Sequence, residues 1–356
     1  MRKLTKILVT GGAGFIGSNF IRYLFRHTEF EGKAVNVDKL TYAGNMENLV
    51  DIAGEYEGDR YFFERVDICD RNALDRIFDQ YEIDTVVHFA AESHVDRSIF
   101  GPAEFIHTNI LGTFSLLETA RKYWSGRDDV LFHHVSTDEV YGSLDKSGYF
   151  FETTSYDPHS PYAASKASSD HLVKSYYHTY KLPITLSNCS NNYGPYQFPE
   201  KLIPLMILNM MNEKPLPVYG DGKNVRDWLF VEDHASAVWL ILNRGKEGET
   251  YNIGGENEWE NITLVNKLCE LVAQQNRKER DYYKKLITYV KDRPGHDRRY
   301  AINCDRIKKD LGWSQSVEFD EGLSRTVKWY VANDRWVQNI LSGDYQKWID
   351  RNYGDR

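Results

Sequence analysis

The sequence predicts an α/β fold, in which a doubly wound parallel sheet is followed by a smaller C-terminal lobe. In the first half of the chain, short apolar runs alternate with longer amphipathic stretches, which is typical of parallel strands covered by helices on both faces. After residue 190 this alternation breaks, and helix-like segments are separated by loops that contain proline and glycine. We therefore expect a domain over residues 1–190 and a second one over 191–356, from which some chain returns to the first.

Each element follows from its own pattern. The apolar runs predict strands at Ile7–Thr10, Ala34–Val37, Tyr61–Val66, Thr85–Phe89, Phe132–Ser136 and Ile184–Asn188. The amphipathic stretches between them predict helices at Phe15–Arg26, Ala73–Gln80, Pro102–Tyr123 and Tyr162–Tyr180. In the second half we expect helices at Leu202–Met211, Val231–Asn243 and Thr263–Gln274.

Composition limits the class of function. The chain has 356 residues, a net charge of −8 and 41% hydrophobic residues, which fits a globular enzyme and disfavours a basic nucleic-acid surface. No apolar run is long enough for a membrane span. The four cysteines are scattered without metal-ligand spacing, which fits a reducing compartment. We expect a cytoplasmic protein that binds neither metal, membrane nor nucleic acid.

A glycine-rich turn follows the first predicted strand. Gly11, Gly14 and Gly17 would let the backbone approach a pyrophosphate at the start of the next helix, which makes the sheet Rossmann-type. Asp38 ends the second strand, where a carboxylate can bind ribose hydroxyls and repel a 2′-phosphate. The expected cofactor is therefore NAD rather than NADP. The other residues assigned to its site are Phe15, Ile16, Asp67, Ile68, Ala90 and Ala91.

Tyr162 and Lys166 lie one turn apart on a predicted helix, for which Ser160 is a suitable N-cap. An ammonium beside the phenol would lower the pKa of Tyr162, so that the phenolate could take a proton from a sugar hydroxyl. The same spacing is also common on exposed helix faces, and only the glycine turn upstream makes the catalytic interpretation the better one.

An acidic pair follows the fifth predicted strand. Thr137 could hydrogen-bond the same sugar hydroxyl, and Asp138 and Glu139 could act as an acid and a base whose pKa values are set by their surroundings. Neighbouring side chains of an extended strand point to opposite faces, so both carboxylates can serve one site only if the chain turns here. The alternative is a solvated acidic loop.

These residues resemble the extended branch of the short-chain dehydrogenase/reductase superfamily and, within it, the family of dTDP-glucose 4,6-dehydratases. Besides Thr137–Glu139, the resemblance rests on AAESHVDRS at 90–98, NCSNNYGP at 188–195 and DRPGHDRRY at 292–300. It extends from Lys6 to about Trp313. The family usually has aspartate two residues after Ala301, where this chain has Asn303.

The resemblance implies an activity and the roles of individual residues. Tyr162 would be the base at the sugar 4-hydroxyl, assisted by Thr137 and Lys166, while Glu139 would remove the C5 proton and Asp138 would protonate the departing 6-hydroxyl. Asn192 would contact NAD. The implied substrate-binding residues are Ser93, Thr137, Asn191, Lys201, Leu202, Pro217, Tyr219, Arg226, Asn261, Arg293 and His296. Related enzymes form homodimers through the helices predicted at Pro102–Tyr123 and Tyr162–Tyr180.

Three other functions remain open at the level of sequence. A sugar-nucleotide 4-epimerase would share the glycines, Tyr162 and Lys166, but it has no use for an acid–base pair that eliminates water. A 4,6-dehydratase could instead act on a UDP- or GDP-linked hexose. A regulatory nucleotide sensor is disfavoured because Tyr162, Lys166, Asp138 and Glu139 are all present.

Overall fold

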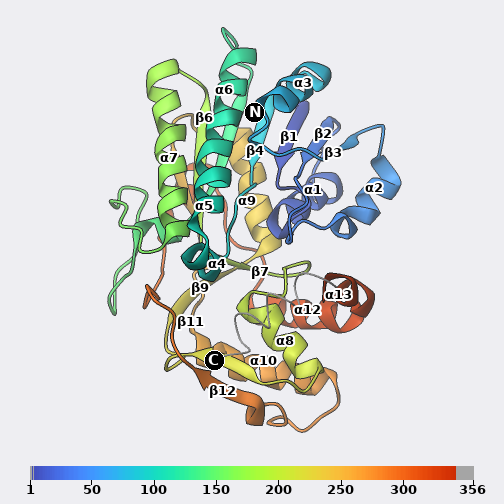
Figure 1. Ribbon diagram of the computed structural model, residues 1–356, viewed down its shortest axis with the longest axis vertical. Helices are drawn as coiled ribbons and strands as arrows, with labels where there is room; N and C mark the ends of the chain where they lie inside the picture. The colour runs from blue at the N-terminus through green and yellow to red at the C-terminus, as the bar shows by residue number, and fades with distance from the viewer. Residues whose placement is uncertain (1, 3, 342–356) are drawn as a thin grey trace.

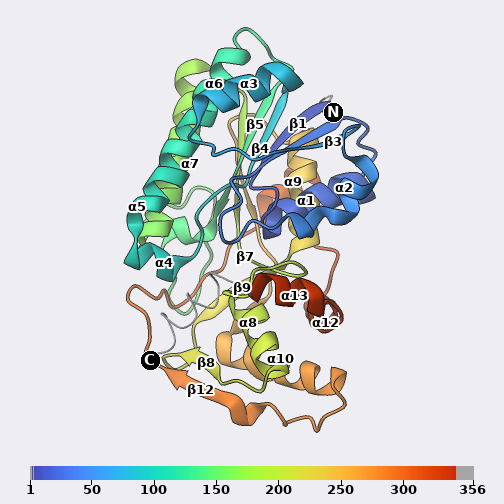
Figure 2. The ribbon, with the colours of Figure 1, turned by 45° about the vertical axis from the view of Figure 1, so that its right-hand side comes forward.

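The computed structural model describes residues 2 and 4–341, and its centre is a parallel seven-stranded sheet in the order β10-β6-β5-β4-β1-β2-β3 (Figures 1 and 2). Every neighbouring pair in this sheet is parallel, as expected. The strands are β1 Lys6–Thr10, β2 Lys33–Val37, β3 Tyr61–Glu64, β4 Thr85–His88, β5 Leu131–Thr137, β6 Ile184–Cys189 and β10 Thr250–Ile253. The doubly wound α/β prediction is confirmed.

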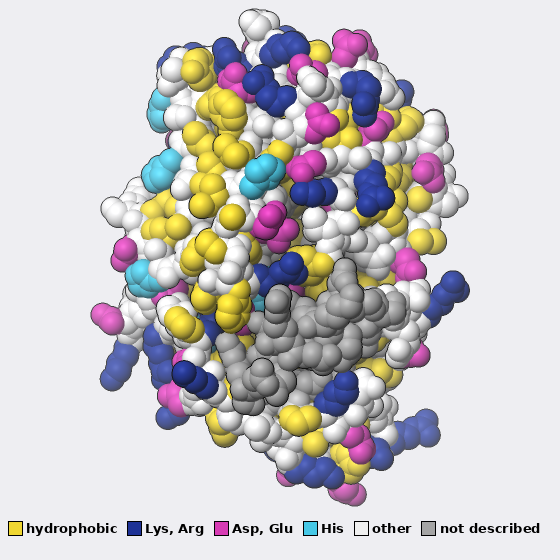
Figure 3. All heavy atoms as spheres, in the orientation of Figure 1, with side chains coloured by type: hydrophobic (Ala, Val, Ile, Leu, Met, Phe, Trp, Pro, Cys, Tyr) yellow, Lys and Arg dark blue, Asp and Glu magenta, His cyan; other side chains and the backbone are white. Residues whose placement is uncertain are grey.

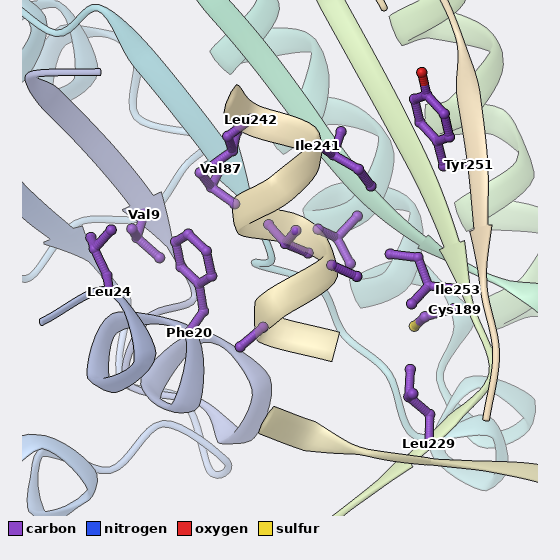
Figure 4. Close-up of a cluster of buried hydrophobic side chains, with 14 of the residues drawn as sticks. Val9, Phe20, Leu24, Val87, Cys189, Leu229, Ile241, Leu242, Tyr251 and Ile253 are labelled. Atoms are coloured by element: carbon purple, nitrogen blue, oxygen red, sulfur yellow. The ribbon is translucent and has the colours of Figure 1, made fainter. Parts of the chain in front are cut away.

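Helices cover both faces of the sheet. On one face α1 (Phe15–His27) packs against α9 (Val231–Arg244), and on the other α6 (Thr113–Tyr123) lies between α3 (Arg71–Tyr81) and α7 (Pro161–Tyr180). Side chains of a strand alternate between these layers. Figure 4 shows Val9 and Val87 on the α1–α9 side with Phe20, Leu24 and Ile241. The intervening residues of the same strands, such as Leu8 and Val86, join the cluster on the other face.

The strand order creates the position of the site. From β1 the chain runs outward to β2 and β3, and it then returns to β4 on the other side of β1. At such a reversal the loops at the carboxyl ends of the strands diverge and leave a crevice. The loops after β1, β4, β5 and β6 therefore meet at one edge.

The second lobe lies below that edge in Figures 1 and 2. It has a three-stranded sheet of β7 (Asn191–Tyr193), β9 (Val225–Phe230) and β11 (Glu258–Glu260), and a pair of β8 (Leu216–Tyr219) and β12 (Ile287–Val290). Its core is a separate cluster that includes Ile207, Leu268 and Leu323. Its helices are α8 Leu202–Met211, α10 Asn261–Gln275, α12 Phe319–Ala332 and α13 Asp334–Leu341.

Short elements complete the described chain. They are α2 Val50–Tyr56, α4 Val95–Phe100, α5 Pro102–Phe105, α11 Asp305–Leu311 and the single-turn segments η1 Met46–Leu49, η3 Asp138–Tyr141 and η4 Lys284–Leu286. No helix in this part of the chain is long and apolar enough to cross a membrane.

Two features differ from the expected elements. The helix expected at Pro102–Tyr123 is present as one uninterrupted helical run, but its middle differs from an α-helix, because α5 leads into a π-helical segment, η2 (Ile106–Gly112), before α6 begins. There Asn109 bonds Ser165 and the backbone of Glu92, and Gly112 lies against Ile68, so tertiary contacts hold the wider turn. The strand β10 and the helix α9 both come from the second half and complete the first domain. The expected second domain ends at residue 356, and residues 342–356 lie outside those described.

Candidate active site

A cleft opens at the carboxyl edge of the sheet, and residues from both halves of the chain line it. All thirteen residues assigned to the cofactor line this cleft, namely Gly11, Gly14, Phe15, Ile16, Gly17, Asp38, Asp67, Ile68, Ala90, Ala91, Tyr162, Lys166 and Asn192. Thr137, Asp138 and Glu139 line it as well, together with Ser93, Asn191 and Lys201 from the expected substrate set. The fold thus gathers residues from the ends of six strands and from α7 at one place.

The glycine turn is shaped by close backbone contacts. Gly11 has a φ of +70°, and a Cβ there would lie 2.7 Å from the backbone of Ala90. A Cβ on Gly17 would lie 2.3 Å from the carbonyl oxygen of Gly11. The helix α1 then begins at Phe15, and Gly14 provides no side-chain cap, so the first N–H groups of the helix remain available for an anion in the cleft.

Asp38 places an acidic group at the expected ribose end of the cleft. Its carboxylate accepts hydrogen bonds from the backbone N–H groups of Ala13 at 3.0 Å and Leu40 at 2.8 Å, while burial raises its pKa. The neighbouring Lys39 is paired with Asp67 at 2.8 Å. Since the one adjacent cation is neutralised, this end of the cleft suits ribose hydroxyls better than a 2′-phosphate, and the residues present fit NAD.

The acidic pair enters the cleft because the chain turns directly after β5. Thr137 caps the short η3 by accepting a hydrogen bond from the N–H of Glu139 at 3.3 Å, and both carboxylates line the cleft. Burial raises the pKa of Asp138 well above its usual value, and the charge of Glu139 adds to this rise. Burial also raises the pKa of Glu139, but Arg293, Lys201 and Arg226 oppose that rise. The two acids therefore sit in different electrostatic surroundings.

Tyr162 and Lys166 stand on the first turns of α7. Ser160 caps this helix by accepting from the N–H of Ala163, as predicted, and Pro161 is the first helical residue. The side chain of Lys166 is buried, and its Nζ donates to the carbonyl oxygen of Val135 at 2.8 Å.

The expected lowering of the Tyr162 pKa by Lys166 is wrong for this structure. Burial raises the pKa of Tyr162 well above its usual value, and the charge of Glu139 raises it further. A hydrogen bond with Thr137 acts in the opposite direction. The ammonium of Lys166 donates to the Val135 carbonyl oxygen, and burial lowers the pKa of Lys166 itself.

The expected substrate residues divide into two groups. Lys201 donates to the carbonyl oxygen of Ser93 at 3.0 Å inside the cleft. Arg293 and Tyr219 both reach the buried Asp96, at 3.3 and 2.9 Å. Arg293, Tyr219 and the other members do not line the cleft itself. Leu202 starts α8, Pro217 lies on β8 and Asn261 starts α10. The charges of Arg226 and Arg293 both act on His296.

Arg226 is more deeply placed than a surface cation. It is 5% exposed, it donates to the carbonyl oxygens of Val225 and Asp297, and its guanidinium lies 4.3 Å from the centre of the Tyr300 ring. Its charge acts on both Asp138 and Glu139. Arg226 therefore joins the second lobe to the acidic pair.

Some residues of the site escaped the sequence reasoning. Thr108, Cys189, Gln197 and Glu200 line the cleft, and burial raises the pKa of Glu200 to about 7. Glu200 accepts from the Tyr42 hydroxyl at 3.0 Å. The only available signal was its position next to Lys201, since a single glutamate in a loop has no pattern of its own. Within the described residues, no group of three or more His, Cys, Asp or Glu side chains could hold a metal.

Comparisons with known proteins agree with this geometry. Residues 8–326 match the family model described as GDP-mannose 4,6 dehydratase. The chain is 56% identical to the dTDP-glucose 4,6-dehydratase of Shigella flexneri, with 99% of each chain covered. It is also 56% identical to that of Neisseria meningitidis serogroup B, over 96% of this chain and 98% of the other.

Among solved structures, the Bacillus anthracis dTDP-glucose 4,6-dehydratase in complex with NAD is 45% identical, with a TM-score of 0.83 over 94% of this chain and 99% of the other. The UDP-glucose 4-epimerase of Thermotoga maritima is more distant in sequence, at 31% identity and a TM-score of 0.81 over 92% and 98% of the two chains. The acidic pair in the cleft, the glycine turn and these full-length relatives lead to one conclusion: the chain belongs to the dTDP-glucose 4,6-dehydratase family.

Proposed function

We propose that the protein converts dTDP-glucose into dTDP-4-keto-6-deoxyglucose with loss of water, in the first steps of deoxysugar (rhamnose-type) nucleotide biosynthesis. The observation that carries this proposal is the turn at η3, which brings Asp138 and Glu139 together into the cleft beside Tyr162. Elimination of water needs a base that removes the C5 proton and an acid that protonates the departing 6-oxygen. Epimerisation at C4 does not need such a pair. The family to which the chain belongs supports the same reaction.

NAD would be held by the glycine turn, Asp38, Ala90 and Asn192. When bound, it accepts the C4 hydrogen of the sugar and returns that hydrogen at C6. The glycine turn and the open start of α1 would receive its diphosphate, and Asp38 would receive the adenosine ribose. Tyr162 would lie at the opposite end of the bound NAD, next to the reacting sugar.

The proton transfers belong to the chain's own residues. Tyr162 takes the proton of the 4-hydroxyl in its phenolate form, and the hydrogen bond with Thr137 is the contact that lowers its pKa toward that form. Once C4 is a ketone, the C5 proton becomes acidic because the carbanion delocalises as an enolate, and Glu139 removes it. Asp138, whose raised pKa favours its protonated form, gives its proton to the departing 6-oxygen. The order of these steps is fixed, since C5 is not acidic before C4 is oxidised.

The two lobes would have different roles in the reaction. The first domain, residues 1–190, would hold the cofactor and the catalytic residues. The second would bind the nucleotide, with Arg293, Lys201 and Arg226 as the cations whose charges act on Glu139. The four cysteines are all free, which supports a cytoplasmic location.

The turnover test separates this function from its rivals. The purified protein is incubated with dTDP-, UDP- and GDP-linked hexoses, and the products are analysed by mass for loss of water. We expect loss of water with dTDP-glucose, and we expect a substrate deuterated at C4 to give product deuterated at C6. An epimerase would return the label to C4 and release no water, and efficient turnover of a UDP- or GDP-sugar alone would assign a different base.

Two variants test the order of steps. Glu139→Gln should still oxidise C4, seen as absorbance of the reduced cofactor, but it should not lose water. Tyr162→Phe should stop before oxidation and show little of that absorbance. Normal dehydration by Glu139→Gln would overturn the assignment of this carboxylate.

The cofactor content gives an independent test. Because NAD is regenerated in every cycle, it need not leave, and we expect the purified protein to contain NAD and to need none added. The protein is denatured and the supernatant is chromatographed. Recovery of NADP, or of no dinucleotide together with no stimulation by NAD, would contradict this prediction.

A homodimer is the expected assembly. Phe100, Ile106, Leu111, Phe114 and Tyr180 are large apolar side chains on the outer sides of α4, η2, α6 and α7, and they are 38 to 70% exposed. Figure 3 shows apolar side chains gathered over these helices. Because related enzymes form dimers through these helices, we expect the partner to be a second copy of this chain. A two-fold contact would cover this apolar surface on both copies.

A further inference from the structure

We propose that Asp96 is a positioning residue, which holds one end of the Arg293 guanidinium so that its other edge receives the diphosphate of the nucleotide sugar. The inference deepens the proposed function and rests on it, since Arg293 is expected to bind the substrate. In this assignment Asp96 touches neither the substrate nor the cofactor and acts only through Arg293.

Asp96 lies where the two lobes meet. It belongs to α4, at the end of the first domain that faces the second lobe (Figures 1 and 2). Three residues earlier, Ser93 lines the cleft, and its carbonyl oxygen accepts a hydrogen bond from Lys201 at 3.0 Å. Asp96 itself is 4% exposed. A carboxylate as buried as this needs partners from the protein, because water cannot solvate it.

The second lobe provides a partner for each carboxylate oxygen of Asp96. Nη1 of Arg293 donates to Oδ1 at 3.3 Å, and the hydroxyl of Tyr219 donates to Oδ2 at 2.9 Å. Burial acts to raise the pKa of Asp96, but the charge of Arg293 and these hydrogen bonds outweigh it, and the pKa is lowered. Asp96 is therefore a charged anchor for Arg293 at neutral pH.

The opposite edge of the guanidinium indicates a ligand. Nη1 of Arg293 is engaged by Asp96, while its Nε is buried and has no hydrogen-bond partner among the described residues. Nearly all buried N–H donors in proteins are paired, so this part of the site is incomplete without an acceptor. Nε and Nη2 form the side of a guanidinium that can bind two oxygens of one phosphate group.

The charges around Arg293 favour an anion as that acceptor. Burial lowers the pKa of His296 to about 4, and the charges of Arg293 and Arg226 add to this fall. Cations gathered in this way repel one another and attract an anion. The diphosphate is the only charged group of dTDP-glucose, and it offers paired oxygens. An ion pair that merely joined the two lobes would leave the buried Nε unexplained.

The test compares two ligands that differ in the diphosphate. The protein with its bound NAD is titrated with dTDP and with thymidine, and the dissociation constants are measured by calorimetry. Asparagine at position 96 keeps an oxygen for the Tyr219 hydroxyl but has no charge for Arg293. Asp96→Asn should weaken dTDP about tenfold or more, as the loss of one charge-assisted hydrogen bond does. The affinity for thymidine should not change, and with dTDP-glucose KM should rise far more than kcat falls.

A double-mutant cycle tests whether Asp96 acts through Arg293. Arg293→Ala alone should weaken dTDP, and Asp96→Asn added to it should cause no further loss. Asp129→Asn is the matched control, since Asp129 pairs with Arg127 at 2.9 Å on the surface just before β5. It should change neither affinity. If Asp96→Asn does not fold with bound NAD, Asp96→Ser is measured with the same expectation, because serine is smaller and uncharged.

The results separate a positioning role from a structural one. Unchanged affinity for dTDP in the Asp96 variant overturns the inference and leaves the proposed function standing. Equal weakening of dTDP and thymidine, or a further loss in the Arg293→Ala background, also overturns it, because the change then disturbs more than the diphosphate site. If wild type binds dTDP but releases no water from dTDP-glucose, the proposed function fails while the ratio of the two affinities still decides the role of Asp96.

Discussion

At the level of single residues, the site depends on two adjacent carboxylates that experience different surroundings. Asp138 is 2% exposed, and its Oδ2 has no hydrogen-bond partner within the described residues. For Glu139, three cations oppose the rise in pKa that burial causes, because they favour the charged form of its carboxyl group. Burial alone would make both groups acids, and the cations are what leave one of them available as a base.

This arrangement has a cost in stability that depends on pH. Because the pKa of Asp138 is raised in the folded protein, the folded state holds a proton that the unfolded chain gives up above its ordinary pKa of about 3.9. Stability from this group is therefore undiminished below that pH and falls as pH rises through the window up to the raised pKa. Activity is obtained at the expense of stability here.

Asp138→Asn should therefore unfold at a higher temperature than wild type at pH 8, by at least about 2 °C, and at nearly the same temperature close to pH 3. It should also lose dehydration activity. The check is a thermal melt at several pH values for both proteins. An equal or lower melting temperature at pH 8 would show that the buried carboxyl group is compensated by partners other than those seen.

At the level of elements, the turn between β1 and α1 is determined by backbone distances that only glycine allows. A Cβ on Gly17 would meet the Gly11 carbonyl at 2.3 Å and the Gly12 Cα at 2.8 Å, and neither backbone atom can move aside as a side chain could. The start of α1 would have to shift away from the turn. The anion site at that helix end would then lose its geometry.

Gly17→Ala should therefore yield a protein without bound NAD and less stable by about 1–3 kcal/mol. Gly54→Ala is the matched control, because Gly54 lies in α2 with nothing within 4 Å of its added Cβ. That control should keep NAD and gain stability of about 0.5–1 kcal/mol. Denaturant unfolding and cofactor content measure both effects. Retention of NAD by Gly17→Ala would show that the turn does not form the diphosphate site.

At the level of the whole molecule, the expected dimer contact is the outer face of α4, η2, α6 and α7. Apolar side chains exposed together on one face indicate a contact surface more often than a solvated one. The position of this face beside α7 also matters, because α7 carries Tyr162 and Lys166 at its start. A second copy there would support the helix that holds the catalytic pair.

Leu111→Asp should therefore dissociate the expected dimer, since it would place a charge in an apolar contact. Leu111 is 48% exposed in the single chain, so the change should leave the fold of one copy intact. Sedimentation at micromolar concentration should show a dimer for wild type and a monomer for the variant. Tyr149→Asp, a similar change at a 51% exposed residue outside this face, serves as the control. A monomeric wild type would contradict the prediction.

Much of the molecule could be predicted from the sequence because its signals are local. The strands and helices of the first half follow from hydrophobic period, and their observed ends differ from the expected ones by at most two residues for strands β1 to β6. The glycine turn, Asp38 and the capped start of α7 are also local patterns, in which a residue and its near neighbours suffice.

Tertiary structure alone decided what depends on contacts between distant segments. The sequence could not show that β10 closes the sheet, that η2 widens into a π-helix against Ser165 and Ile68, or that Glu200 and Thr108 reach the cleft. It also gave the wrong sign for the Tyr162 pKa, because spacing on one helix says nothing of the burial and the Glu139 charge that raise this pKa. Periodicity records which face of an element is apolar, while burial, charge and hydrogen-bond partners are set by whichever segments the fold brings together.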